Sequence, residues 1–180
     1  GHSDICAGVV VSKKNKIDKI FQSAKNLGGN LSDYTVWLLE RSMKTLSIRV
    51  NAQSENALRI ANFLEKNENV SIVNYPGLQS HPQHELSKKQ MRGFGGMLSF
   101  ALKDEKKANQ FTRFLKIIKP AGSLGGVEST ITSPALTSHA KISKEQREKF
   151  GISEGLLRFS VGIEDYQDLE HDLTQAFDKI

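Results

Sequence analysis

The residue best suited to bind a ligand is Arg158, because of the pattern around it. The alternation over residues 155–165 predicts a strand. Its core face would carry Leu157, Phe159, Val161 and Ile163, and the opposite face Leu156, Arg158, Ser160 and Gly162. A guanidinium among small or apolar neighbours needs a planar anion, since burying an unpaired charge is costly, and a carboxylate accepts two parallel hydrogen bonds from it. That carboxylate can belong to a ligand or to an Asp or Glu of this chain, and the sequence leaves both open.

The other candidates for chemistry carry weaker signals. The glycine-rich segment 123–129 would let backbone N–H groups approach a ligand, but it lacks the spacing and the lysine of a phosphate loop, so a plain turn is equally compatible. Ser138 beside His139 suggests a nucleophile and a base without a third, orienting group. The five histidines lack metal-ligand spacing, His81 and His84 included, so we expect no metal site.

Composition excludes several classes of protein. The 180 residues carry a net charge of +5, but the lysines are scattered and aromatic residues do not interleave with them, which argues against nucleic-acid binding. The single cysteine, Cys6, excludes an internal disulfide and suits a reducing compartment, so we expect a cytoplasmic protein. The longest apolar run, Ile5–Val11, is too short to span a bilayer, and no signal peptide is visible.

The order of expected elements predicts two domains. The continuous apolar run Ile5–Val11 predicts a strand buried on both faces, and such a strand implies further strands upstream of this chain. The apolar spacing after Thr45 predicts one long helix to about Asn67, and because long helices commonly bridge domains we place a boundary between residues 55 and 56. Strands over 70–75, 93–100 and 155–165 mix with helices without βαβ alternation, so the second part is predicted to be α+β. The remaining helices are expected over Lys16–Leu27, after Ser32, from Ala108 to Ile118, over Ser143–Phe150 and after Asp165.

Several short motifs, in register along nearly the whole chain, resemble the Cys/Met-metabolism family of pyridoxal-phosphate enzymes, those of transsulfuration. Residues 41–46 resemble the family's RGLKTL signature, with departures at Ser42 and Met43. Residues 1–4 resemble the segment that directly follows the cofactor-bearing lysine. The other matching stretches are residues 75–78, 81–86, 93–97, 123–129 and 157–165.

The resemblance implies an α/β protein of the aspartate-aminotransferase-like fold (fold type I), of which this chain is the C-terminal half. Residues 1–55 would end the large cofactor domain, and residues 56–180 would form the α+β small domain. Arg158 then falls on the arginine that holds the substrate α-carboxylate, Ser123 on a serine beside the cofactor lysine and the substrate, and Ser138 where relatives often carry Thr near the active site. The Schiff-base lysine is expected just before Gly1, so no catalytic or cofactor-binding residue is assigned within this segment.

The function that the resemblance implies is amino-acid chemistry on pyridoxal 5'-phosphate, acting on cystathionine or O-acylhomoserine in methionine and cysteine metabolism. Gly122 stands where relatives often have Glu, which removes a carboxylate and leaves room. Leu124 stands where β-lyases resembling the enterobacterial enzyme tend to have Trp, and this favours the γ-elimination or γ-replacement of a cystathionine γ-lyase or γ-synthase. A cystathionine β-lyase, an O-acylhomoserine sulfhydrylase and a non-catalytic binding module stay open. We expect the segment alone to be inactive, and the complete protein to form dimers of active sites paired into a homotetramer, without nucleic-acid or membrane partners.

Overall fold

The computed structural model describes residues 1–180, except for the side chain of Glu105. The chain divides into two compact units, Gly1–Ser47 and Ile48–Ile180, and the division falls near the start of the long helix α3 (Leu46–Glu65). The predicted domain boundary at residues 55/56 lies in the same helix and stays a prediction. No helix within the described part of the chain is both long and apolar enough to cross a membrane.

The first unit contains two helices whose ends follow local sequence signals. Helix α1 (Lys14–Leu27) ends at Gly28, which adopts the left-handed conformation (φ 72°) that only glycine enters without strain. Helix α2 (Asp33–Met43) begins after Ser32, whose hydroxyl oxygen accepts a hydrogen bond from the Thr35 N–H at 3.3 Å. Both helix ends confirm the sequence-based prediction.

The strand predicted over Ile5–Val11 is not formed. This segment has no regular structure, and Val9 and Val11 are 86% and 89% exposed. A strand exists only where a neighbouring strand accepts and donates its backbone hydrogen bonds. Among the described residues, the strands all lie in the second unit, between Val70 and Ser160.

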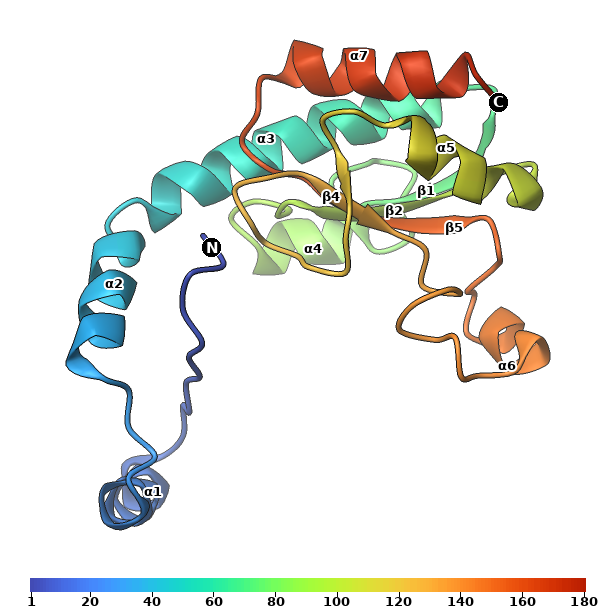
Figure 1. The fold of residues 1–180 in the computed structure, drawn as a ribbon. Coiled ribbons are helices and arrows are strands. Elements are labelled where there is room, and N and C mark those ends of the chain that lie inside the picture. Colours follow the sequence, from blue (N-terminus) through green and yellow to red (C-terminus); the bar gives the residue numbers. More distant parts are fainter. The chain divides into compact units, whose positions relative to one another are not determined.

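The second unit is built on a five-stranded sheet in the order β1-β2-β5-β4-β3 (Figure 1). All neighbouring strands are antiparallel except β3 and β4, which are parallel. The strands are β1 (Val70–Asn74), β2 (Met97–Leu102), β3 (Lys119–Pro120), β4 (Thr130–Thr132) and β5 (Leu156–Ser160). The helices that follow α3 are α4 (His84–Gln90), the short 3-10 helix η1 (Glu105–Lys107), α5 (Ala108–Phe114), α6 (Lys144–Lys149) and α7 (Tyr166–Phe177).

Helices α3, α5 and α7 cover one face of this sheet and form the core with it (Figure 1). The centre of the core is the apolar face of β5, where Leu157 and Phe159 are fully buried. They pack in one cluster with residues of the three helices: Ile60, Leu64, Phe111, Leu169 and Leu173. Burying a side chain of this size contributes about 1.5–3 kcal/mol to the free energy of folding. Because side chains alternate along a strand, burying Leu157 and Phe159 in the core turns Arg158 toward the opposite face of the sheet. Ile163, predicted to share the core, is 43% exposed because β5 ends at Ser160 and the alternation ends with it.

Two other differences from the predicted elements have physical causes. The helix expected over 108–118 ends at Phe114, although Leu115 and Ile118 are buried as predicted. It ends because the carboxylate of Asp172 accepts hydrogen bonds from the N–H groups of residues 116–118, which a continued helix would have used internally. Helix α4 is absent from the helices that the sequence predicted, and it carries Glu85 in its first turn and two lysines in its last, as the helix dipole favours.

Candidate carboxylate-binding site

Arg158 lies at the middle of the central strand, on the face of the sheet opposite to the core. In the register of the sheet it pairs with Ser99 of β2 on one side and with Thr132 of β4 on the other. Ser99 pairs in turn with Asn74 of β1, whose amide donates to the Ser99 hydroxyl at 3.3 Å. Residues directly opposite each other on neighbouring strands share a face of the sheet, so Arg158 belongs to a polar row that crosses four strands.

The Arg158 guanidinium is held by backbone carbonyl groups. Its Nη2 donates to the carbonyl oxygen of Gly122 at 2.8 Å and to that of Ser123 at 3.3 Å. Among the side chains that the structure describes, no Asp or Glu oxygen lies within 4.0 Å of the guanidinium. The internal ion pair that the sequence left open is therefore not found among them. A guanidinium has five N–H donors, so a planar anion can be bound by those that the two carbonyls do not use.

The carbonyls that hold Arg158 belong to a glycine-rich loop, residues 122–129, which is anchored by side chains from outside it. The Ser160 hydroxyl oxygen accepts from the Gly125 N–H at 2.8 Å, and the Gln53 amide Nε2 donates to the Gly126 carbonyl at 2.6 Å. Gly125 has a φ of 67°, which a side chain would strain. The loop is thus set by one side chain from the Arg158 strand and one from helix α3.

The far end of the same loop is held by Glu164. Its Oε1 accepts from the Ser129 N–H at 2.6 Å and its Oε2 from the Ser129 hydroxyl at 2.9 Å. The Ser129 hydroxyl oxygen accepts in turn from the Gly162 N–H at 2.9 Å. Asn56 of α3 donates to the Glu164 carbonyl at 2.8 Å, so the segment that follows β5 is itself fixed to the helix. A Cβ on Gly162 would overlap with the Val127 carbonyl oxygen, which explains why glycine stands at this contact.

The structure brings together two of the three predicted substrate-binding residues. Arg158 and Ser123 meet through the main-chain carbonyl of Ser123, which also accepts from the Thr130 hydroxyl at 3.0 Å. Ser138 lies in the turns that follow β4, exposed, and its hydroxyl hydrogen-bonds with His139 Nδ1 at 2.8 Å. The roles of all three in binding a substrate stay predictions.

Three residues that hold the site were not predicted to belong to it. Gln53 was visible only as a polar interruption in the apolar stripe of a helix. Ser160 and Glu164 lie in the same motif as Arg158, but nothing in their spacing indicates which backbone groups they bind. The three bonds join residues 35 to 73 positions apart, so no local signal in the sequence could have pointed to them.

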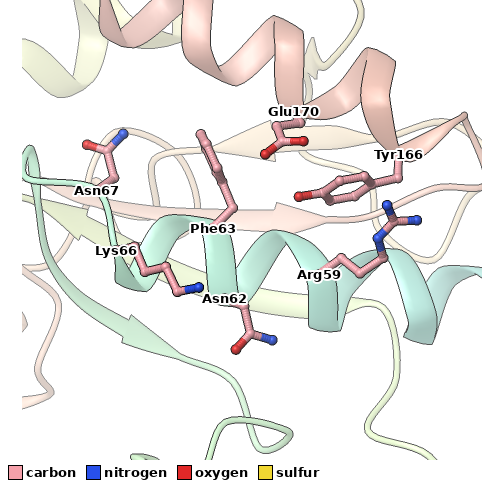
Figure 2. A pocket seen from close by; sticks show the side chains of 7 residues that line it. All are labelled: Arg59, Asn62, Phe63, Lys66, Asn67, Tyr166 and Glu170. Atoms are coloured by element: carbon pink, nitrogen blue, oxygen red, sulfur yellow. The ribbon is translucent and has the colours of Figure 1, made fainter.

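A hollow of about 490 Å³ lies elsewhere in the second unit (Figure 2). It is open to solvent and lined by residues of α3 and α7 and by the two residues that follow α3: Arg59, Asn62, Phe63, Lys66, Asn67, Tyr166 and Glu170. The guanidinium carbon of Arg59 lies 3.6 Å from the centre of the Tyr166 ring, so this cation already has a partner. Burial and the neighbouring Glu170 raise the pKa of Tyr166. Both helices cover the core face of the sheet, so the hollow is separate from the face of Arg158.

The second unit is thus an α/β segment with an arginine on the central strand of its sheet, held by two backbone carbonyls. The chain belongs to the Cys/Met metabolism PLP-dependent enzyme family, whose sequence model matches residues 1–178. It is 47% identical over 180 residues to the cystathionine beta-lyase of Lactococcus lactis subsp. cremoris (strain MG1363), covering 99% of this chain and 47% of that protein. It is 45% identical over 181 residues to the cystathionine gamma-lyase of Bacillus subtilis (strain 168), covering 100% of this chain and 48% of that protein.

Comparison with solved structures confirms the fold. The structure matches the crystal structure of cystathionine gamma-lyase from Lactobacillus plantarum, complexed with L-serine, with a TM-score of 0.92 and 39% identity. The match covers 100% of this chain and 48% of the other. The chain is thus an α/β segment that corresponds to the C-terminal half of a fold type I enzyme, and it spans about half the length of the relatives it matches.

Proposed function

We propose that the protein containing this segment is a pyridoxal-phosphate-dependent transsulfuration enzyme, in which this segment binds the substrate's α-carboxylate. One observation carries the proposal: Arg158 is fixed on the central strand by two backbone carbonyls, and no described carboxylate of the chain lies within ion-pair distance of it. Membership of the family supports the cofactor and the amino-acid substrate.

The residues of the site fit the substrate rather than the cofactor. The donor set at Arg158 is a planar fork that matches a carboxylate, and we assign none of the described residues to the cofactor's ring or phosphate. Pyridoxal phosphate, when bound to the complete enzyme, supplies the electron sink for bond breaking next to the amino group. The part of Arg158 is to hold the carboxylate in one plane, which fixes how the α-carbon and its substituents are turned. Ser123 and Ser138 would add hydroxyl groups near the bound substrate.

Within the family we propose cystathionine or an O-acylhomoserine as substrate, with γ-elimination or γ-replacement as the reaction. Leu124, in place of the Trp that β-lyases tend to have, supports the γ-type enzymes. The similarity to a cystathionine beta-lyase at 47% identity favours β-elimination as the alternative. We also propose a cytoplasmic homotetramer, by analogy with the family.

Product analysis separates these reactions. β-Elimination of cystathionine releases homocysteine, pyruvate and ammonia, whereas γ-elimination releases cysteine, 2-oxobutanoate and ammonia. γ-Replacement on O-acylhomoserine by cysteine instead forms cystathionine and releases the acyloxy group as a carboxylate. We expect 2-oxobutanoate from cystathionine, or cystathionine from O-acylhomoserine and cysteine; pyruvate as the main keto acid would assign the β-lyase reaction.

The role of Arg158 is tested by Arg158→Lys in the complete enzyme. Lysine keeps the charge but loses the two-pronged geometry, and charge-assisted hydrogen bonds contribute about 1.5–3 kcal/mol. We expect kcat/KM to fall about ten- to hundredfold, mainly through a rise in KM, with the cofactor's visible absorption retained. Arg113→Lys, on the exposed last turn of α5, is the matched control. An unchanged kcat/KM in Arg158→Lys would refute the proposal.

A further inference from the structure

Gln53 is a buried amide in the apolar face of helix α3. It is 7% exposed, and the next residues along the same face, Ala57 and Ile60, are fully buried and apolar. Burying an amide is unfavourable unless it is hydrogen-bonded. Gln53 Nε2 meets this requirement by donating to the Gly126 carbonyl at 2.6 Å, 73 residues away in sequence. Its Cβ also packs closely on Gly96, where an added Cβ would lie 3.0 Å from it.

The bond from Gln53 leads directly to the groups that hold Arg158. Gly126 is buried, whereas Gly122 and Ser123, which offer their carbonyl oxygens to the guanidinium, are exposed. The loop between them has no helix or strand of its own and contains Gly125 at positive φ. Its position therefore depends on its anchors, of which Ser160 belongs to the sheet and Gln53 to helix α3.

We propose that Gln53 is a positioning residue for the substrate carboxylate. It fixes the loop whose carbonyl oxygens set the plane of the Arg158 guanidinium, and it touches neither the substrate nor the reacting atoms. Two parallel hydrogen bonds to a carboxylate require that plane to match. Loosening the loop lets the guanidinium turn, which weakens binding of the carboxylate. This inference rests on the proposed function of Arg158.

The test is Gln53→Met in the complete enzyme, with Gln175→Met as the matched control. Methionine is of similar length and lacks the donor. Gln175 of α7 is also partly buried and donates to a backbone carbonyl, that of Phe114 at the end of α5, at 2.7 Å, but on the core side of the sheet. We expect both variants to lose stability, and only Gln53→Met to raise KM, by about fivefold, which corresponds to one hydrogen bond, with kcat nearly unchanged. An equal rise in KM in the two variants would overturn the inference.

A double-mutant cycle separates positioning from a general structural effect. In the Arg158→Lys background, Gln53→Met should leave kcat/KM nearly unchanged, because the guanidinium that Gln53 helps to align is no longer present. Binding of a substrate analogue without the α-carboxylate should be equally insensitive to Gln53→Met. The same effect of Gln53→Met on kcat/KM in both backgrounds would overturn the inference. If Gln53→Met does not fold, Gln53→Asn, which keeps the amide but shortens its reach, is compared in the same cycle.

Failure of this inference and failure of the proposed function give different results. If Arg158→Lys leaves kcat/KM unchanged, the proposed function is wrong. If Arg158→Lys lowers kcat/KM but Gln53→Met does not, Arg158 binds the carboxylate without help from Gln53, and only the inference is wrong.

Discussion

Two carboxylates, Asp172 and Glu164, hold backbone segments in the same way but with different consequences. Asp172 is 2% exposed and accepts from three consecutive N–H groups, those of residues 116–118, at 2.8–2.9 Å. Glu164 is half-buried and accepts from one residue, through the N–H and the hydroxyl of Ser129. Asp172 thus fixes the chain where it leaves α5, and Glu164 fixes it where the glycine-rich loop ends.

The surroundings of the two carboxylates explain which task each one has. Asp172 projects from α7 between Leu169 and Leu173, which are fully buried in the core, so its bonds stabilise the packing of α5 against α7. Glu164 follows the Arg158 strand and reaches the loop whose carbonyls hold the guanidinium. Asp172 therefore stabilises the packing of two helices, whereas Glu164 stabilises the loop that holds Arg158. Because Asp172 is more buried and accepts more hydrogen bonds, we expect its loss to lower the free energy of unfolding more than the loss of Glu164.

The largest effect on stability is expected from Asp172→Ala. The variant leaves three backbone N–H groups without their acceptor, one of them on the buried Ile118. We expect the free energy of unfolding to fall by about 3–4 kcal/mol, measured by urea unfolding followed by circular dichroism. KM of the folded enzyme should change little, because Asp172 lies on the core side of the sheet. A large rise in KM at unchanged stability would contradict this prediction, because it would show that Asp172 supports the substrate site rather than the fold.

A smaller loss of stability is expected from Gly162→Ala, which disturbs the contact between the glycine-rich loop and the segment that carries Glu164. The new Cβ would overlap with the Val127 carbonyl oxygen and lie 2.7 Å from the carbonyl carbon of Glu128, and backbone atoms cannot move aside cheaply. We expect a loss of about 2–3 kcal/mol in unfolding free energy, together with a rise in KM. Gly122→Ala is the control for stability, since no atom lies within 4 Å of its added Cβ. Equal losses of stability in the two variants would contradict the prediction, because the backbone would then have moved to remove the overlap at residue 162.

The features that the sequence could predict are those decided by neighbouring residues. Ser32, Ser143 and Asp165 each accept a hydrogen bond from an N–H two or three residues ahead, so local sequence suffices to find these helix starts. The alternation around Arg158 correctly placed Leu157 and Phe159 in the core, because side chains on a strand point to opposite faces in turn.

The features that the sequence could not predict depend on residues far apart in the chain. Gln53 and Gly126 are 73 residues apart, Asp172 and Ile118 are 54 apart, and Arg158 and Gly122 are 36 apart. No local pattern indicates such pairs, which arise only once the sheet has its order. The Ile5–Val11 strand failed for the related reason that a strand also needs a neighbour, which composition cannot supply.

The smallest effect on stability is expected from Glu164→Gln. This variant also tests most directly whether Glu164 and Asp172 have different tasks. The glutamine oxygen can still accept from the Ser129 N–H, but its amide would face the Ser129 hydroxyl, which donates to Glu164 in the present structure. That hydroxyl already accepts from the Gly162 N–H. It would have to accept a second bond and leave its own hydrogen without this partner, so one charge-assisted bond is lost and the others are weakened.

We therefore expect Glu164→Gln to lower the free energy of unfolding by only about 1–1.5 kcal/mol, and to raise KM about two- to fivefold in the complete enzyme. Asp172→Asn is the matched variant: it makes the same change of oxygen to amide, but places the amide against backbone N–H groups that cannot reverse their role. Asp172→Asn should thus lose more stability and less affinity for substrate than Glu164→Gln. Urea unfolding gives the loss of stability and steady-state kinetics gives the rise in KM for both variants. If the variant that loses more stability also shows the larger rise in KM, the two carboxylates share one structural task and the prediction is wrong.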